Sequence, residues 1–165
     1  DQPYAAVDNL TSTEPAAKPS TIEVAQLREG AVIAGIESRI NLSSDVQPQL
    51  ERSWQRFSEL NLQNSLKPQD PSRVFAVYHN YDPQQNRVSV TLGYPAPKNF
   101  SFNGRIHAVT VDPGQYMVLP QDYVLDSWSR AEQFNHSLRF KSYYEIYQLS
   151  ADFQVDQFTA FVAIQ

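Results

Sequence analysis

Hydrophobic and polar residues alternate over several short stretches of the chain, and this period of two predicts β-strands. The first stretch, residues 22–41, reads as two strands separated near Glu29-Gly30, where the glycine permits a tight turn. The other predicted strands are 73–81, 87–95, 105–112, 115–120, 142–149 and 158–164. Turn-forming residues at 82–86 and 112–114 join successive strands, which predicts antiparallel pairs.

Two stretches instead repeat apolar residues every three to four positions, and this spacing predicts amphipathic helices. The first helix is predicted to follow cap residues at 43–45 and to run to about residue 60. The second is predicted within residues 122–135. The two apolar stripes are Val46, Leu50, Trp54 and Phe57, and Val124, Trp128, Ala131 and Phe134.

The order of strands and helices in the first half returns in the second half. Residues 53–56 recur in part as residues 127–130, and residues 75–78 align with residues 144–147. Because several elements repeat in the same order, the pattern indicates an internal duplication. It predicts an α+β fold in which antiparallel strands of two similar halves are covered by two helices, with a ligand cleft between the halves.

Length and composition fit one folded domain with a tether in front of it. The chain has 165 residues, of which 41% are hydrophobic. Residues 1–20 are rich in Ala, Ser, Thr and Pro and predict a linker, so residues 21–165 are expected to form the domain. The sequence begins with Asp1, which is consistent with removal of a signal peptide or an upstream domain, or with a boundary of the piece. Cytoplasm is one expected location, and the periplasm or cell envelope is expected if a signal peptide was removed.

Charge and residue types exclude several classes of function. A net charge of −5 without a basic stripe argues against direct nucleic-acid binding, and no apolar run approaches the roughly 20 residues of a membrane span. The chain has no cysteine, and its three histidines are too far apart to form a helical metal site, so no metal and no cofactor are expected. No catalytic residue is assigned, because no nucleophile elbow or phosphate loop occurs.

A candidate binding site lies on the predicted strand 142–149. Alternation places Tyr143, Glu145 and Tyr147 on one face, so a carboxylate lies between two aromatic rings. The equivalent face of the first half carries Ala76 where the second half carries Glu145. A poorly solvated carboxylate among aromatic rings favours an organic cation. The alternative is a solvent-facing Glu flanked by tyrosines that are ordinary strand formers.

The chain resembles the GyrI-like domain, an effector-binding domain also fused to AraC-type and MerR-type regulators and related in fold to SOUL haem-binding proteins. The resemblance covers about residues 22–164 and rests on segments that occur in the same order. They are Leu27-Arg28-Glu29-Gly30 with 32–36, Trp54 and Phe57, 75–82, 111–116 and 144–147. It implies pseudo-twofold duplicated β-α-β-β units around a central pocket. The final strand, 158–164, departs from the pattern of the family.

The resemblance also implies a function. It places the pocket carboxylate on Glu145, with Tyr78, Tyr147, Tyr116 and Trp128 as candidate ligand-binding residues and a small amphipathic or aromatic cation as the partner. The protein would act as a sensor or sequestering module, or as the effector domain of a transcription regulator. Two alternatives follow from other members: a hydrolase of reactive electrophilic toxins in which Glu145 activates water, and an inhibitor that binds a protein partner. From packing alone, the stripes predict Trp54 and Trp128 as core residues.

Overall fold

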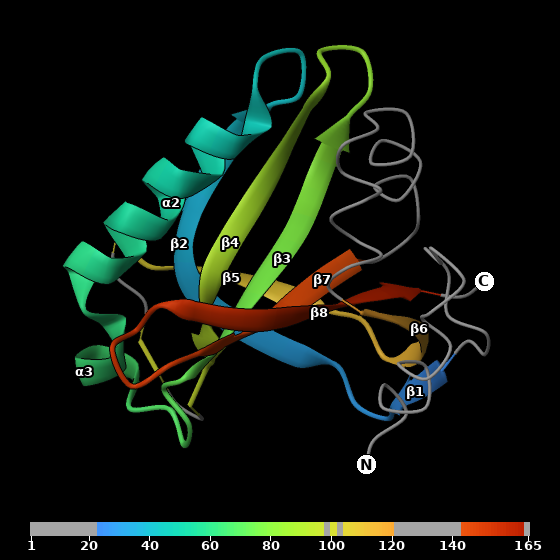
Figure 1. Ribbon diagram of the computed structural model, residues 1–165. Helices are drawn as coiled ribbons and strands as arrows, with labels where there is room; N and C mark the ends of the chain where they lie inside the picture. The colour runs from blue at the N-terminus through green and yellow to red at the C-terminus, as the bar shows by residue number, and fades with distance from the viewer. Residues whose placement is uncertain (1–22, 98–99, 102–103, 121–142, 164–165) are drawn as a thin grey trace, which may run out of the picture.

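The structure is a computed structural model that describes residues 23–97, 100–101, 104–120 and 143–163 (Figure 1). It confirms the predicted α+β fold, with antiparallel strands in the predicted order and the first predicted helix in its predicted place. The elements are β1 (Glu23–Leu27), β2 (Ala31–Asn41), α2 (Val46–Leu60), α3 (Leu62–Leu66), β3 (Arg73–Asp82), β4 (Arg87–Pro95), β5 (His107–Val111), β6 (Gly114–Pro120), β7 (Tyr143–Leu149) and β8 (Val155–Ala163). The predicted tether, 1–20, and the predicted second helix, 122–135, lie outside the described residues.

The strands form one antiparallel sheet in the order β1-β6-β8-β7-β3-β4-β2-β5. The two halves of the sequence therefore meet where β3 pairs with β7 in the middle of the sheet. Figure 1 shows the long hairpin β3–β4 running steeply across β7 and β8, so the sheet is strongly curled. No helix among the residues described is long and apolar enough to cross a membrane.

A pair of glycines lets β2 and β4 come close together in this curled sheet. Gly35 pairs directly with Gly93. A Cβ atom on Gly35 would collide with the backbone carbonyl of Leu92, and one on Gly93 would collide with that of Ala34. Only glycine fits at these two positions, because the obstructing atoms belong to the backbone and cannot rotate away.

Helix α2 forms as its cap and apolar stripe predict. The carboxylate of Asp45 accepts a hydrogen bond from the backbone N–H of Gln47 at 3.3 Å and so caps the N-terminus. Leu50 and Phe57 are buried on the side of α2 that faces the sheet, while Val46 and Trp54 are partly buried beside them. Figure 1 shows α2 lying along β2 and β4. The helix thus covers one face of the first half of the sheet.

The structure differs from the predicted elements most clearly at two places. The loop expected after residue 60 contains the short helix α3, which begins after Asn61 turns the chain in a left-handed conformation. Leu62 and Leu66 are spaced four residues apart and are buried, so this spacing was a signal for the helix. Strand β8 begins at Val155 rather than at 158, because Val155 and Gln157 extend the pairing with β7.

The sheet buries apolar side chains on both faces. One cluster includes Leu50 and Phe57 of α2 together with Ala76, Tyr78 and Tyr147 of the central strands. The other cluster lies on the opposite face, where the curled sheet brings together the buried side chains of Ile33, Val77, Val111, Tyr116, Tyr144 and Ala163. The two faces therefore differ in what covers them, and a strand residue is assigned to one or the other by alternation.

Candidate functional site

Strand β7 places a buried carboxylate among tyrosines, as alternation predicted. The side chain of Glu145 is 0% exposed. The Tyr143 hydroxyl donates a hydrogen bond to one carboxylate oxygen, Oε2, at 2.7 Å, and the Tyr147 hydroxyl donates to the other, Oε1, at 2.8 Å. Glu145 is therefore not the solvent-facing residue of the alternative interpretation.

The neighbouring strands leave room for this carboxylate. Glu145 pairs with Ala76 on β3 and with Ala160 on β8, and both alanines are buried. Tyr78 lies two residues beyond Ala76, and its hydroxyl also hydrogen-bonds to Glu145. The Tyr78 and Tyr143 rings are 5.3 Å apart between centroids. Three phenol groups thus surround one carboxylate, and the two residues paired directly with it are alanines.

The electrostatics of the group follow from burial. Removal from water raises the pKa of Glu145 to about 7, although the hydrogen bonds from Tyr143, Tyr147 and Tyr78 act in the opposite direction. Burial and the adjacent carboxylate raise the pKa of Tyr78 and of Tyr147 well above that of a free phenol. The phenols therefore remain protonated donors at neutral pH, while Glu145 takes up or releases its proton near pH 7.

The carboxylate has no positively charged neighbour in the part of the chain that the structure describes. No ion pair to Glu145 is present there, and no basic residue contributes to its pKa. A buried carboxylate without a counter-charge is costly, because neither water nor a cation stabilises its ionised form. The arrangement would therefore gain from a cation supplied by a ligand.

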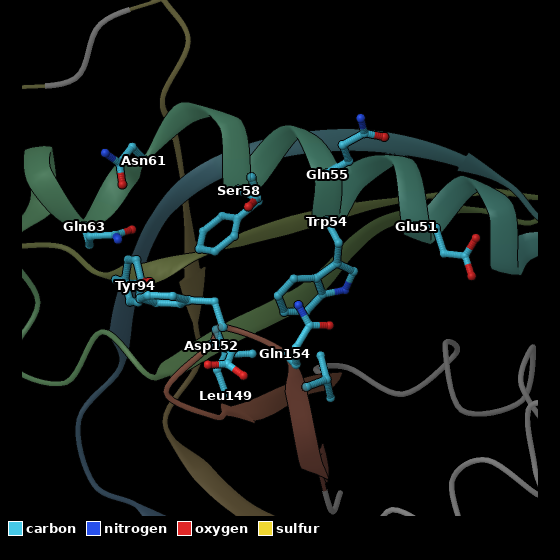
Figure 2. Close-up of a pocket in the computed structure, with 13 residues that line it drawn as sticks. Glu51, Trp54, Gln55, Ser58, Asn61, Gln63, Tyr94, Leu149, Asp152 and Gln154 are labelled. Atoms are coloured by element: carbon cyan, nitrogen blue, oxygen red, sulfur yellow. The ribbon is translucent and has the colours of Figure 1, made fainter.

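A groove of about 600 Å³ lies between α2 and the turn that joins β7 to β8. Its lining includes the aromatic rings of Trp54, Phe57, Tyr94 and Phe153 and the carboxylates of Glu51 and Asp152, and no Lys, Arg or His is among the described lining residues. Figure 2 shows Trp54 projecting from α2 toward the turn, which carries Asp152 and Gln154 on the other side. The groove is thus aromatic and acidic.

The groove and the buried carboxylate are linked through two rings. Trp54 lines the groove and meets Tyr147 edge-on, with 4.9 Å between the ring centroids. Tyr147 in turn donates its hydroxyl hydrogen to Glu145. Trp54 therefore packs in the core, as its helical stripe predicted, and also forms a wall of the groove.

Not all of the predicted site residues come together. Tyr147 and Tyr78 both hydrogen-bond to Glu145. Tyr116 is on the opposite face of the sheet, where it donates a hydrogen bond to the carbonyl oxygen of Asp112 at 2.6 Å and meets Tyr144 edge-on. Trp128 lies outside the described residues. The structure thus groups three of the five and separates Tyr116 from them.

Sequence reasoning missed several residues of this region. Tyr143 was visible on the face of Glu145 but was not selected as a site residue. Sequence alternation also gave no reason to expect that residues from separate elements line one groove. They are Tyr94, Asp152 and Phe153. A phenylalanine between two polar residues, Asp152 and Gln154, was the signal that the sequence offered for Phe153.

The described residues offer no alternative centre for a metal. They contain no group of three His, Asp or Glu side chains that could hold an ion. His79 is on the face opposite Glu145, and its Nε2 atom hydrogen-bonds with the hydroxyl of Thr91 at 2.9 Å. Burial lowers the pKa of His79. This histidine therefore forms a hydrogen bond with Thr91 and lies apart from the Glu145 site.

Comparison with known proteins identifies the fold. No protein-family model matches the chain, and no curated protein matches it. Among solved structures, that of SAV2435 bound to tetraphenylphosphonium is 15% identical with a TM-score of 0.58 and covers 86% of this chain and 92% of its own. A candidate bacterial transcription regulation protein from Staphylococcus aureus MU50 is 15% identical, with a TM-score of 0.57 and coverage of 87% and 99%.

A third structure extends this similarity to another source. An integron cassette protein from the mobile metagenome of Vibrio cholerae is 18% identical, with a TM-score of 0.56 and coverage of 88% of this chain and 97% of its own. The chain therefore spans nearly the whole length of each of these proteins and has their fold. The matches fit the fold implied by the resemblance to the GyrI-like domain.

Proposed function

We propose that this protein binds small lipophilic organic cations and that Glu145 supplies the counter-charge. The observation that carries the proposal is a fully buried carboxylate that is held by tyrosine hydroxyls and has no basic partner among the described residues. The similarity to a fold seen with tetraphenylphosphonium in SAV2435 supports it. Such a module would act as a sensor or a sequestering protein, either alone or as the effector domain of a transcription regulator.

The physical basis is that the ionised form of Glu145 is better stabilised when a cation occupies the site than when the site is empty. Without a cation, Glu145 is protonated or ionised in nearly equal amounts near pH 7, because burial has raised its pKa. A lipophilic cation supplies positive charge and loses little hydration on entering an aromatic site. The ring of Trp54, which lines the groove, attracts the same charge through its negatively polarised face. Binding therefore stabilises the ionised carboxylate.

Access is expected from the groove between α2 and the β7–β8 turn. Glu145 is buried, while Trp54 and Tyr147 separate it from the groove. Rotation of these two side chains would open a passage without any change in the sheet. The proposal thus includes movement of Trp54 on binding, which its fluorescence would report.

The test is isothermal titration calorimetry with tetraphenylphosphonium, a cation that has no proton to lose. For the Glu145→Gln variant we expect a loss in affinity of about 30-fold, or about 2 kcal/mol, because the counter-charge is removed while the shape is kept. Asp156→Asn is the matched control, since Asp156 is an exposed acid on β8 outside the groove. Equal binding by wild type and Glu145→Gln would refute the proposal.

One observation favours a second function, the hydrolysis of an electrophile. A carboxylate with a pKa of about 7 is suited to accept a proton from water at neutral pH. Turnover of a strained electrophilic substrate that is lost in Glu145→Gln would support this function. Binding of cations without turnover of such substrates would favour the binding module.

A further inference from the structure

We propose that the groove between α2 and the β7–β8 turn is a second cation subsite, so that the preferred ligand is an elongated molecule with a positive charge at each end. One charge would lie at Glu145 and the other between the rings and carboxylates of the groove. The inference rests on the proposed function, since it takes Glu145 as the first of the two subsites. It adds the class of ligand and the residues that select it.

The groove has the chemistry of a cation site. Rings of Trp54 and Phe153 come from its two walls, and so do the carboxylates of Glu51 and Asp152. With no basic residue among the described lining, neither carboxylate is neutralised inside the groove. Aromatic rings combined with carboxylates attract alkylammonium, phosphonium and similar ions by charge and by ring polarisation.

The position of the groove makes it a subsite rather than a separate site. Trp54 belongs to its lining and contacts Tyr147, which donates its hydroxyl hydrogen to Glu145. This pair of rings therefore connects the groove with the buried carboxylate. A ligand that displaces the rings and reaches Glu145 would leave its other end in the groove.

The β7–β8 turn, which forms the outer wall of the groove, contains a residue with an unfavourable backbone conformation. Phe153 has a φ angle of 60°, in the left-handed region that bulky side chains disfavour, and its side chain is 50% exposed. The turn is maintained by hydrogen bonds from the Phe153 N–H to the Ser150 carbonyl at 2.9 Å and from the Ser150 N–H to the Gln154 carbonyl at 2.8 Å. A glycine would fit this backbone better. A costly, half-exposed aromatic residue at the groove indicates a role in binding.

The experiment compares two permanent cations by calorimetry: an alkyltriphenylphosphonium and the matching bis(triphenylphosphonium) alkane, in a series of linker lengths. For wild type we expect the dication to bind at least about ten-fold more tightly at the best linker length, well above the roughly two-fold statistical advantage of two equal ends. The preference should weaken at high salt, because the groove carboxylates are exposed.

Variants of the β7–β8 turn test whether its residues cause the preference for the dication. We expect Asp152→Asn and Phe153→Gly each to weaken the dication about five-fold more than the monocation, so that the preference for the dication falls by that factor. Phe153→Gly should also keep or raise the melting temperature, since it relieves the left-handed conformation, so lost binding cannot be attributed to unfolding. Asp156→Asn on the same hairpin is the control and should change neither affinity.

The outcomes separate this inference from the proposed function. Equal affinities of wild type for monocation and dication would overturn the second subsite, and so would a preference that persists in both turn variants. If neither cation binds, or if Glu145→Gln leaves the binding of both unchanged, the proposed function itself fails. Support for both requires that Glu145→Gln weakens both cations and that the turn variants weaken the dication more than the monocation.

Discussion

Replacing Glu145 by Gln should make the protein more stable above neutral pH, which is an unusual result for a residue with so many hydrogen bonds. The pKa of Glu145 is about 7 in the folded protein and 4.5 for the ordinary side chain. Between these values the folded form keeps a proton that the unfolded form has released. Stability contributed by this proton is therefore lost as pH rises from about 4.5 to about 7.

The magnitude follows from the same two values. Their difference corresponds to about 3 kcal/mol at pH values above 7, using about 1.4 kcal/mol for each unit of pKa. A neutral amide keeps the size of the side chain and can still accept hydrogen bonds from the tyrosines, so the variant avoids this cost. Wild type and Glu145→Gln should thus have similar stability at about pH 5 and differ by up to about 3 kcal/mol at about pH 8.

The assay is unfolding by urea at several pH values, followed by intrinsic fluorescence. The informative quantity is the difference between variant and wild type, because His79 contributes a pH dependence of the opposite sign. Its pKa is lowered by burial, so its contribution to stability rises with pH up to its ordinary value of 6.5. A difference that does not change between about pH 5 and pH 8, or a wild type that is the more stable at pH 8, would refute the reasoning.

Three further predictions concern binding, packing and the helix cap. Affinity for tetraphenylphosphonium should fall by about ten-fold over the first pH unit below about 7 and level off near the affinity of Glu145→Gln, because only the ionised Glu145 pairs with the cation; a flat calorimetric profile would contradict this. Gly35→Ala should destabilise the protein by about 3 kcal/mol or more in urea unfolding, since its Cβ would strike the Leu92 carbonyl, whereas Gly104→Ala, with no atom near its Cβ, should be tolerated. Asp45→Ala should cost about 1 kcal/mol in the same assay through loss of the α2 cap, and Asp156→Asn should cost much less.

Local sequence patterns predicted the features of the fold that arise within a single helix or strand. The helical stripe and cap predicted α2, and alternation predicted the face shared by Tyr143, Glu145 and Tyr147. These patterns have a direct physical cause, since one face of each element is buried. The internal repeat likewise predicted that the halves form equivalent strands, which the central pairing of β3 with β7 confirms.

The parts that the sequence did not predict depend on how the sheet curls. Tyr116 is in a predicted strand, but its assignment to a face required knowledge that β6 continues the sheet beyond β8 and packs its aromatic ring against Tyr144. The groove required the β7–β8 turn to lie beside α2, a contact between residues far apart in the chain. The left-handed conformation of Phe153 contradicts the preference of its residue type, so no propensity argument would have found it.

The repeat also explains why only one of two equivalent positions carries an acid. Ala76 aligns with Glu145 in the repeat, and the same two residues pair directly in the sheet, so the pseudo-twofold axis passes between them. Equivalent tyrosines, Tyr78 and Tyr147, therefore reach one carboxylate from its two sides. Acids at both positions would bring two buried carboxylates together, which would force one of them to stay protonated.

A swap of the two residues tests this symmetry. The double variant Ala76→Glu with Glu145→Ala moves the carboxylate across the axis to a place that the same two tyrosines can reach. We expect it to bind tetraphenylphosphonium at least about ten-fold more tightly than Glu145→Ala alone, although less well than wild type, because Val74 occupies the place equivalent to Tyr143. The matched control, Val74→Glu with Glu145→Ala, puts the acid off the axis and should not restore binding. A folded swap variant that binds no better than this control would show that the tyrosines do not act as a symmetric pair.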